Sequence, residues 1–543
     1  MKPVRVLFVG WDGAEPALVE PWVAQGKLPV LAGLVRRGAL GRVASTVPAT
    51  TPPAWSSLVT GLQPGRHGIY SFTRPGRTSY AEELVTATER QGATIWHYLS
   101  AAGCRVGIFN LSLSYPPEPV AGFLFAGFDA PVFNSSLAYP AAAFGVATHN
   151  IVKYVHEGLD RDGGREEGQA ELLRQLRQQC DMVFNLTAQY PVEILAVNFN
   201  AADHIHHHAW PVGVDAAGVA AQDGPILRTY QELDTVLGDL LTAYADEETQ
   251  VMLISDHGGG QTVGQVSLSR AFEAGGFLVR QGRRRGGALL SLRRGLRKLL
   301  PHALKVRLWG LGGVNFRLDM ARRVRGAMAG DVDWSRTKIF PWGSSGFAQV
   351  NQRGRETQGC VAPEDAPRVL EDVAAYLRTL RDPRTGAPAV GEILTRAAAY
   401  GEHAVGYAPD LLVQGAGGDY SVMPWWQCQG ASVVNLEDPG ENRIPVTSHH
   451  QPDGILATAG PAVRAGAVVP PLAMADLAPA LLYLSGVPVP AGLDGQLARS
   501  LWDTGRAPEG QEASTASAAP VATPYSEAEQ AAVERRLTDL GYM

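Results

Sequence analysis

The first half of the chain alternates short apolar runs with segments of helical periodicity, and this alternation limits the possible fold most. The apolar runs lie at Val4–Val9, Val106–Asn110, Val192–Asn198 and Gln250–Ser255. The segments with helical spacing lie at Leu28–Val35, Arg165–Tyr190 and Tyr230–Ala245. Such alternation is typical of a largely parallel sheet that carries helices on both faces. We therefore predict an α/β fold.

The length of 543 residues allows one large α/β domain with insertions, or two or three smaller domains. A formal net charge of -6 provides no global positive field, so we expect no specific nucleic-acid binding. Four widely spaced cysteines without a C-x-x-C motif argue against a disulfide framework and a thiolate zinc site. The N-terminus shows no signal peptide, and no apolar run reaches the roughly 20 residues that a membrane span needs. We therefore expect a cytoplasmic protein without a membrane span, and the oligomeric state is not predicted.

Acidic side chains follow three of the strand-like runs at the point where each run ends. These acids are Asp12, Asp203 and Asp256. Ligands of open α/β sheets bind outside the carboxyl ends of the strands. Three acids placed at this edge therefore predict a common site.

Imidazoles accompany two of these acids. His257 directly follows Asp256, and the glycines that come next leave room for a ligand to approach closely. His207 lies four residues after Asp203, so on a helical turn both share one face. Oxygen and nitrogen ligands together suit zinc, or manganese where oxygen ligands dominate. We expect the remaining histidines of this turn to be neighbours of the site and not ligands: His204, His206 and His208.

Thr51 precedes two prolines and a helix-like run, so it falls near a helix N-cap. A hydroxyl there lies beside free backbone N–H groups and the positive end of the helix dipole, which favours phosphate. A threonine hydroxyl is a weak nucleophile until a base or a metal lowers its pKa, so this chemistry requires nearby metals. Plain capping is the alternative interpretation, and Thr50 and Ser45 are local competitors.

The last candidate ligand lies far along the chain, in SHHQPDGI, where spacing alone leaves open whether His449 or His450 is meant. With it, the chain supplies carboxylates, imidazoles and one hydroxyl in the number that two divalent metals and a nucleophile need. Pairs of metal ions that coordinate one hydroxyl and one phosphate recur in phosphoryl-transfer enzymes. A metal-dependent phosphohydrolase is therefore the leading hypothesis.

At these residues the chain resembles the alkaline phosphatase superfamily, specifically its type I phosphodiesterase/nucleotide pyrophosphatase branch. It is similar there to bacterial proteins described as AlkP-superfamily phosphohydrolase/phosphomutase. The resemblance covers most of residues 4–502 and rests on GWDGAEP, TTPPAWSSLVTGLQPGRHGIYSF, YPPEP, ADHIHHHAW, SDHGGG and HHQPDGILATAGP. It implies a three-layer sandwich with a largely parallel central sheet.

Carried onto matching positions, the family's pattern implies two metals, usually zinc, with manganese as the alternative. One would be held by Asp12, Asp256 and His257, with Thr51 as the nucleophile on it. The other would be held by Asp203, His207 and His450. The resemblance favours His450 because this residue lies four positions before Gly454, as in the family motif.

The chain departs from the nucleotide pyrophosphatases at Ala54, where those enzymes carry an asparagine that helps to hold the phosphate. Substrate contacts must therefore come partly from elsewhere, and Asn110, Trp55 and a basic insert are the candidates.

Composition also divides the chain. The stretch from Val279 to Arg325 is rich in arginine and leucine, which indicates an inserted cap or lid of basic amphipathic helices. Its basic faces are interpreted as solvated helix faces, as a guide for an anionic substrate, or as a surface that docks to a membrane. Ala507–Pro524 is rich in Ala, Ser, Pro and Thr and indicates a linker. We predict a discontinuous catalytic core (1–265 and 336–503), a basic helical cap (266–335), and a flexible linker with a C-terminal helix (504–543).

The predicted function is a phosphodiesterase that acts on a small phosphate ester through a phosphothreonine intermediate. A phosphomonoesterase and a phosphomutase are alternatives on the same site. A metal-binding regulatory protein without catalysis is the alternative from another class.

Overall fold

The computed structural model describes most of the 543 residues. The described residues are 2–76, 79–131, 133–149, 151, 164–211, 214–281, 332–424, 432–436, 448–505, 510–511, 529–530, 532–534 and 537. The basic side chains of the predicted cap, from Arg283 onward, and the linker Ala507–Pro524 lie almost entirely outside these residues.

The centre of the molecule is an eight-stranded sheet. Its strands follow one another in the order β2 (Gly38–Ala44), β19 (Asp453–Ala459), β9 (Gln250–Ile254), β1 (Val6–Trp11), β8 (Ile194–Phe199), β5 (Val106–Phe109), β6 (Gly122–Phe125) and β7 (Ala138–Tyr139). The five strands from β9 to β6 are parallel, whereas β19 and β7 run antiparallel to their neighbours. All residues of β1, β8 and β9 are buried, as expected for strands covered on both faces.

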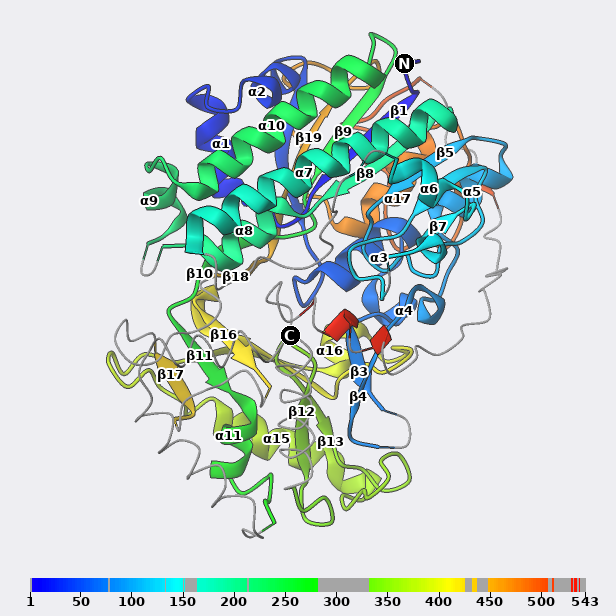
Figure 1. Ribbon diagram of the computed structural model, residues 1–543. Coiled ribbons are helices and arrows are strands. Elements are labelled where there is room, and N and C mark those ends of the chain that lie inside the picture. The colour runs from blue at the N-terminus through cyan, green and yellow to red at the C-terminus, as the bar shows by residue number, and fades with distance from the viewer. Residues whose placement is uncertain are drawn as a thin grey trace, which may run out of the picture.

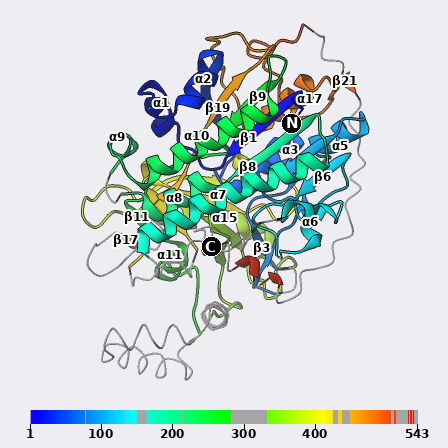
Figure 2. The ribbon, with the colours of Figure 1, turned by 45° about the horizontal axis from the view of Figure 1, so that its top comes forward.

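Helices cover both faces of this sheet, so the α/β fold predicted from the alternating pattern is confirmed. One layer contains α1 (Pro16–Ala24), α2 (Pro29–Arg36), α7 (Gly164–Gln189), α8 (Ala201–Ala209) and α10 (Pro225–Tyr244). The other contains α3 (Thr51–Thr60), α5 (Ile95–Ala101) and α17 (Leu477–Leu484), which contact one another. Figures 1 and 2 show α7 and α10 crossing in front of the sheet.

A second lobe lies beyond the carboxyl edge of the sheet (Figure 1). It contains a three-stranded sheet of β16 (Tyr420–Met423), β11 (Gly264–Ser267) and β17 (Val434–Leu436). A four-stranded sheet joins β12 (Ile339–Trp342), β13 (Phe347–Val350), β15 (Leu411–Gly415) and β14 (Val390–Thr395). With α11 (Leu268–Ala274) and α15 (Ala366–Leu377), these strands enclose a hydrophobic cluster distinct from that of the main sheet.

This lobe is built largely from residues that the sequence analysis assigned to the catalytic core. Local patterning recognises a buried strand but not the hydrophobic cluster that the strand joins. The domain boundaries at 265, 335 and 503 stay a prediction.

Two described residues near the C-terminus pack against earlier parts of the chain. Val533 and Leu537 are buried in a small cluster with Phe72, Leu84 and Phe128. None of the helices in the described ranges has both the length and the apolar composition needed to cross a lipid bilayer.

Candidate metal centre and active site

The predicted ligands come together at the carboxyl edge of the main sheet. Asp12 follows β1, and Asp256 with His257 follows β9, while Asp203 and His207 lie on α8 directly after β8. Parallel neighbours place these three strand ends side by side, because β1 pairs with both β8 and β9. The site is therefore a direct consequence of strand order.

The remaining pieces come from outside the parallel strands. His450 lies on β18 (Ser448–Gln451), which pairs antiparallel with β10 (Gly258–Gln261), the strand that follows His257. Thr51 is the first residue of α3, and Thr50 is its N-cap. The structure thus places the predicted nucleophile one position inside the helix.

We call Asp12, Asp256 and His257 the first ligand group. One ligand atom from each lies within 4.8 Å of the others, and all three residues are fully buried. Oδ1 of Asp12 and Oδ2 of Asp256 have no hydrogen-bond partner among the described residues. Two buried carboxylate oxygens without a donor require a cation or a proton.

We call Asp203, His207 and His450 the second ligand group. Oδ1 of Asp203 lies 3.3 Å from Nε2 of His207 and 3.5 Å from Nε2 of His450. The two imidazole Nε2 atoms are 3.1 Å apart. The ring of His257 stacks on that of His450 with centroids 3.9 Å apart, so the two groups adjoin.

Backbone carbonyls fix the tautomers of two of these histidines. Nδ1 of His257 lies 2.9 Å from the carbonyl oxygen of Gly258, and Nδ1 of His450 lies 3.0 Å from that of Ala49. A carbonyl only accepts, so each Nδ1 carries the proton and each Nε2 presents a lone pair to the site. This orientation is typical of imidazoles that bind metals.

Strand alternation separates His449 from His450. In the β10–β18 pair, His450 lies opposite Gly259 and His449 opposite Gly260, so their side chains point to opposite faces. His449 contacts Gln451 at 3.1 Å and Thr262 at 3.2 Å. The structure therefore brings His450, and not His449, to Asp203 and His257.

Three carboxylates are buried in one site, and their negative charges are unfavourable there unless protons or cations neutralise them. Burial raises the pKa of Asp256 to about 8. Burial, together with the charges of Asp256 and Asp203, also raises the pKa of Asp12 well above its ordinary value. Burial alone would raise the pKa of Asp203, but His207 beside it lowers that pKa well below its ordinary value.

These observations fit divalent metals. Tetrahedral zinc with bonds of about 2.0–2.1 Å places neighbouring ligand atoms about 3.3 Å apart. The three distances within the second ligand group, 3.1, 3.3 and 3.5 Å, agree with this spacing. In the first group, Oδ1 of Asp12 and Oδ2 of Asp256, which accept no hydrogen bond within the described residues, supply the lone pairs that a cation needs.

The start of α3 has fewer free backbone N–H donors for a phosphate than the sequence predicts. Pro52 and Pro53 carry no N–H, and the N–H of Ala54 donates to the carbonyl oxygen of Thr50 at 3.2 Å. The first turn therefore lacks most of the free donors expected at a helix N-terminus. The Thr51 hydroxyl instead donates to Nε2 of His257 at 3.1 Å.

Trp55 and Asn110, the two residues predicted to contact substrate, form hydrogen bonds within the protein instead. Trp55 is fully buried, and its Nε1–H donates to Oδ2 of Asp12 at 3.1 Å. Nδ2 of Asn198 donates to the same oxygen at 3.2 Å. Asn110 donates through Nδ2 to the carbonyl oxygen of Asn198 at 2.9 Å.

Sequence reasoning missed Asn198 and Glu15. Asn198 lies opposite Gly10 in the β1–β8 register, a signal that appears only once strand order is known. Glu15 caps α1, and its Oε2 accepts from the N–H of Gly259 at 3.0 Å. A glutamate directly before Pro16 is the helix-start signal that could have identified it.

Comparison with known proteins decides the family. The family model "Type I phosphodiesterase / nucleotide pyrophosphatase" matches residues 6–440. This chain belongs to that family. It is an enzyme, a metal-dependent phosphate-ester hydrolase of the alkaline phosphatase superfamily.

Similar solved structures include ectonucleotide pyrophosphatase/phosphodiesterase 5 from mouse and human. The mouse protein is 13% identical with a TM-score of 0.48, and 92% of this chain and 100% of that chain are covered. The human protein is 13% identical with a TM-score of 0.49 and the same coverage. No curated protein sequence matches significantly.

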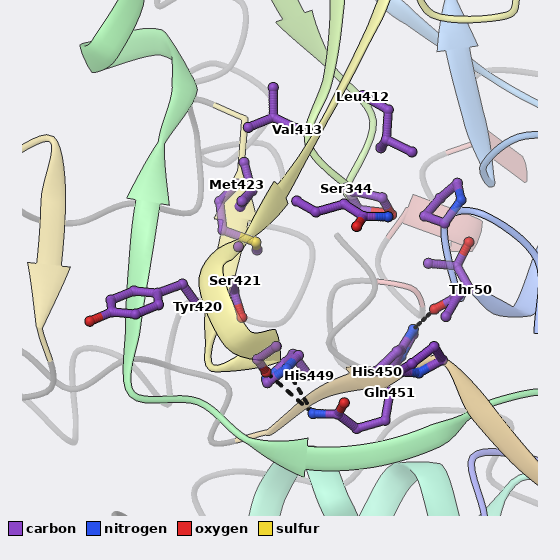
Figure 3. A pocket seen from close by; sticks show the side chains of 18 of the residues that line it. Thr50, Ser344, Leu412, Val413, Tyr420, Ser421, Met423, His449, His450 and Gln451 are labelled. Carbon is purple, nitrogen blue, oxygen red and sulfur yellow. Dashed lines mark hydrogen bonds between the residues drawn. The ribbon is translucent and has the colours of Figure 1, made fainter. Parts of the chain in front are cut away.

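In this phosphodiesterase family member, a cavity of about 460 Å³ opens beside the second ligand group. Its wall includes His207, His450, residues 46–50 before α3, and parts of β15 and β16 in the second lobe. Figure 3 shows His449, His450 and Gln451 on one side and Leu412, Val413 and Met423 on the other. A molecule in this cavity would touch both lobes.

Proposed function

We propose that this hydrolase is a phosphodiesterase in which Thr51 is the nucleophile and the two ligand groups hold two divalent cations, zinc or manganese. The observation that carries the proposal is the position of the Thr51 hydroxyl, 3.1 Å from Nε2 of His257. His257 can complete either a group with Asp12 and Asp256 or a group with Asp203 and His450.

Divalent cations in these groups would supply positive charge to the phosphate oxygens and would lower the pKa of an attacking hydroxyl. The need for such charge is large here because the first turn of α3 has few free N–H donors. Without cations, the buried carboxylates of Asp12, Asp203 and Asp256 would repel a phosphate.

The chain's own residues then perform two displacements. Oγ1 of Thr51 forms a bond to phosphorus while the bond between phosphorus and the leaving alcohol breaks, and the Thr51 proton reaches that alcohol through solvent. The helix start holds Oγ1 in place, because Thr51 is fully buried at the first position of α3. Water then cleaves the phosphothreonine and restores the hydroxyl.

The cavity wall favours a diester over a monoester. Among the described residues that line it, none is lysine or arginine. A monoester carries one more negative charge than a diester and needs an additional cationic partner. We therefore place phosphomonoesterase and phosphomutase activity second.

The test compares bis-p-nitrophenyl phosphate with p-nitrophenyl phosphate on wild-type, Thr51→Ala and Thr50→Ala proteins, each stripped and reloaded with zinc or manganese. We expect metal-dependent diester turnover that Thr51→Ala lowers at least 1,000-fold while metal content stays unchanged. Removing a covalent nucleophile abolishes the first displacement.

Other outcomes would reassign the site. A preference for the monoester would indicate a phosphatase or mutase. Activity lost in Thr50→Ala but kept in Thr51→Ala would move the nucleophile to Thr50. Bound metal without turnover of either ester would support the regulatory alternative.

A further inference from the structure

The wall of the 460 Å³ cavity is more apolar than polar in area, and it carries little charge. Hydroxyl and amide side chains face it together with an aliphatic portion, and within the described lining no side chain is Asp, Glu, Lys or Arg. Among the described residues of the wall, the titratable side chains are Tyr420, His207, His449 and His450.

Two of the polar side chains are placed to bind a ligand. Gln265 on β11 and Ser71 are each only 4% exposed, and both line the cavity. Neither side chain forms a hydrogen bond within the described part of the chain, whereas Gln451 in the same wall donates to the carbonyl oxygen of Gly418 at 3.2 Å. A buried amide and a buried hydroxyl without protein partners favour a ligand that donates and accepts hydrogen bonds.

The aliphatic portion of the wall limits the ligand further. Leu412, Val413 and Met423 lie across the cavity from His450 (Figure 3). Carbon-bound hydrogens of an alcohol can pack there, while a charged group would lose hydration without an ion-pair partner. The combination suits a molecule that carries several hydroxyls on a carbon skeleton.

We propose that this cavity binds the leaving group of the substrate, and that this group is an uncharged polyhydroxy alcohol, a polyol or a sugar. Gln265 and Ser71 are its specificity-determining hydrogen-bond partners. The reaction converts a phosphodiester of that alcohol and water into a phosphomonoester and the free alcohol. This inference rests on the proposed phosphodiesterase function.

The test uses three methyl phosphodiesters that differ in the second alcohol: glycerol (uncharged), choline (cationic) and glycerate (anionic). Release of each alcohol by the metal-loaded enzyme is followed by NMR. We expect kcat/KM for the glycerol ester to exceed those of both charged esters by at least 10-fold. Bis-p-nitrophenyl phosphate, which has no hydroxyl, serves as the reference diester.

A substitution pair then isolates the cavity wall. Gln265→Leu keeps a side chain of similar length without its amide, and Gln358→Leu makes the same change at an exposed position outside the cavity. We expect Gln265→Leu to lower kcat/KM for the glycerol ester about 10- to 100-fold, because hydroxyls of the substrate lose their partner. Turnover of bis-p-nitrophenyl phosphate should change less than about 3-fold, and Gln358→Leu should change neither.

The outcomes separate the two proposals. Equal or better turnover of a charged ester, or an equal loss on both substrates in Gln265→Leu, would overturn the polyol inference while leaving the phosphodiesterase intact. Absence of turnover of bis-p-nitrophenyl phosphate by the wild-type enzyme would overturn the phosphodiesterase proposal, and this inference with it.

Discussion

The two carboxylate oxygens of Asp12 have different surroundings. Oδ2 accepts from Trp55 and Asn198, while Oδ1 has no hydrogen-bond partner among the described residues. Donors that fix one oxygen orient the other, which is how neighbouring residues control metal ligands. We therefore propose that Trp55 positions Asp12 for metal binding.

We predict that Trp55→Phe weakens binding of one metal ion by about 10-fold, because the phenyl ring keeps most of the bulk but loses the donor to Asp12. Zinc affinity is measured by competition with a chromophoric chelator. Trp502→Phe is the matched control, since its Nε1–H donates to Thr458 in the core away from the ligands. Equal zinc affinity in both variants would contradict the positioning role.

A second residue-scale prediction concerns His67, on the short helix α4 (Pro64–His67). Burial, assisted by Arg90, lowers its pKa to about 3, while the unfolded value is about 6.5. Below pH 6.5 the unfolded chain binds a proton that the folded chain rejects until about pH 3, so folding stability falls as the pH falls through this window. From pH 7 to pH 5 the wild type should lose about 2 kcal/mol more unfolding free energy than His67→Gln.

This difference is measured by denaturant unfolding at both pH values with equal metal content. Parallel pH dependences of wild type and His67→Gln would show that His67 is protonated in the folded protein.

At the scale of elements, the β10–β18 pair shows where prediction from sequence reached its limit. Asp12 and Asp256 could be predicted because apolar runs mark the strands that precede them. The segment SHHQ of β18 has no alternating apolar pattern, so its strand, and with it the choice between His449 and His450, emerged only from pairing with β10. The contact between Trp55 and Asp12 likewise depends on tertiary packing.

This pair also makes Gly259 sensitive to substitution. A Cβ there would lie 2.3 Å from Nδ1 of His206, and Gly259 pairs with His450. Gly259→Ala should therefore lower the unfolding free energy by about 1–3 kcal/mol. It should also reduce zinc content, because the clash shifts β10 and the paired strand β18, which carries His450.

The control for this prediction is Gly145→Ala in α6 (Ala143–Ala147), where an added Cβ meets nothing within 4 Å. That variant should keep or raise the melting temperature, because alanine favours helices over glycine by up to about 1 kcal/mol. Unchanged zinc content and stability in Gly259→Ala would contradict the clash.

At the scale of the whole molecule, the two lobes have separate hydrophobic clusters, and the ligand groups lie on the main lobe and the β10–β18 pair. The sequence pattern predicted the layers but not this division, because strands of both lobes look alike locally. Because the two lobes have separate hydrophobic clusters, metal binding should stabilise them to different extents.

We predict that zinc slows amide hydrogen exchange in β9, β10, β18 and α8 but leaves β12–β14 largely unchanged. Metal binding stabilises the elements that bear the ligands, and separate clusters can open separately. Exchange measured by mass spectrometry with and without zinc provides the readout. Equal protection of both lobes would show that they open as one unit.

The strands that complete the sheet and the site, β19 and β18, are synthesised late. The first ligand group, together with Trp55 and Asn198, is complete once residue 257 has left the ribosome, whereas His450 lies 243 positions after His207. β19, which fills the place between β2 and β9, is also made late. A chain that ends before β18 therefore exposes two unpaired strand edges and lacks His450, one of the six candidate ligands. Because unpaired strand edges favour pairing with other chains, we expect such a truncated chain to be aggregation-prone.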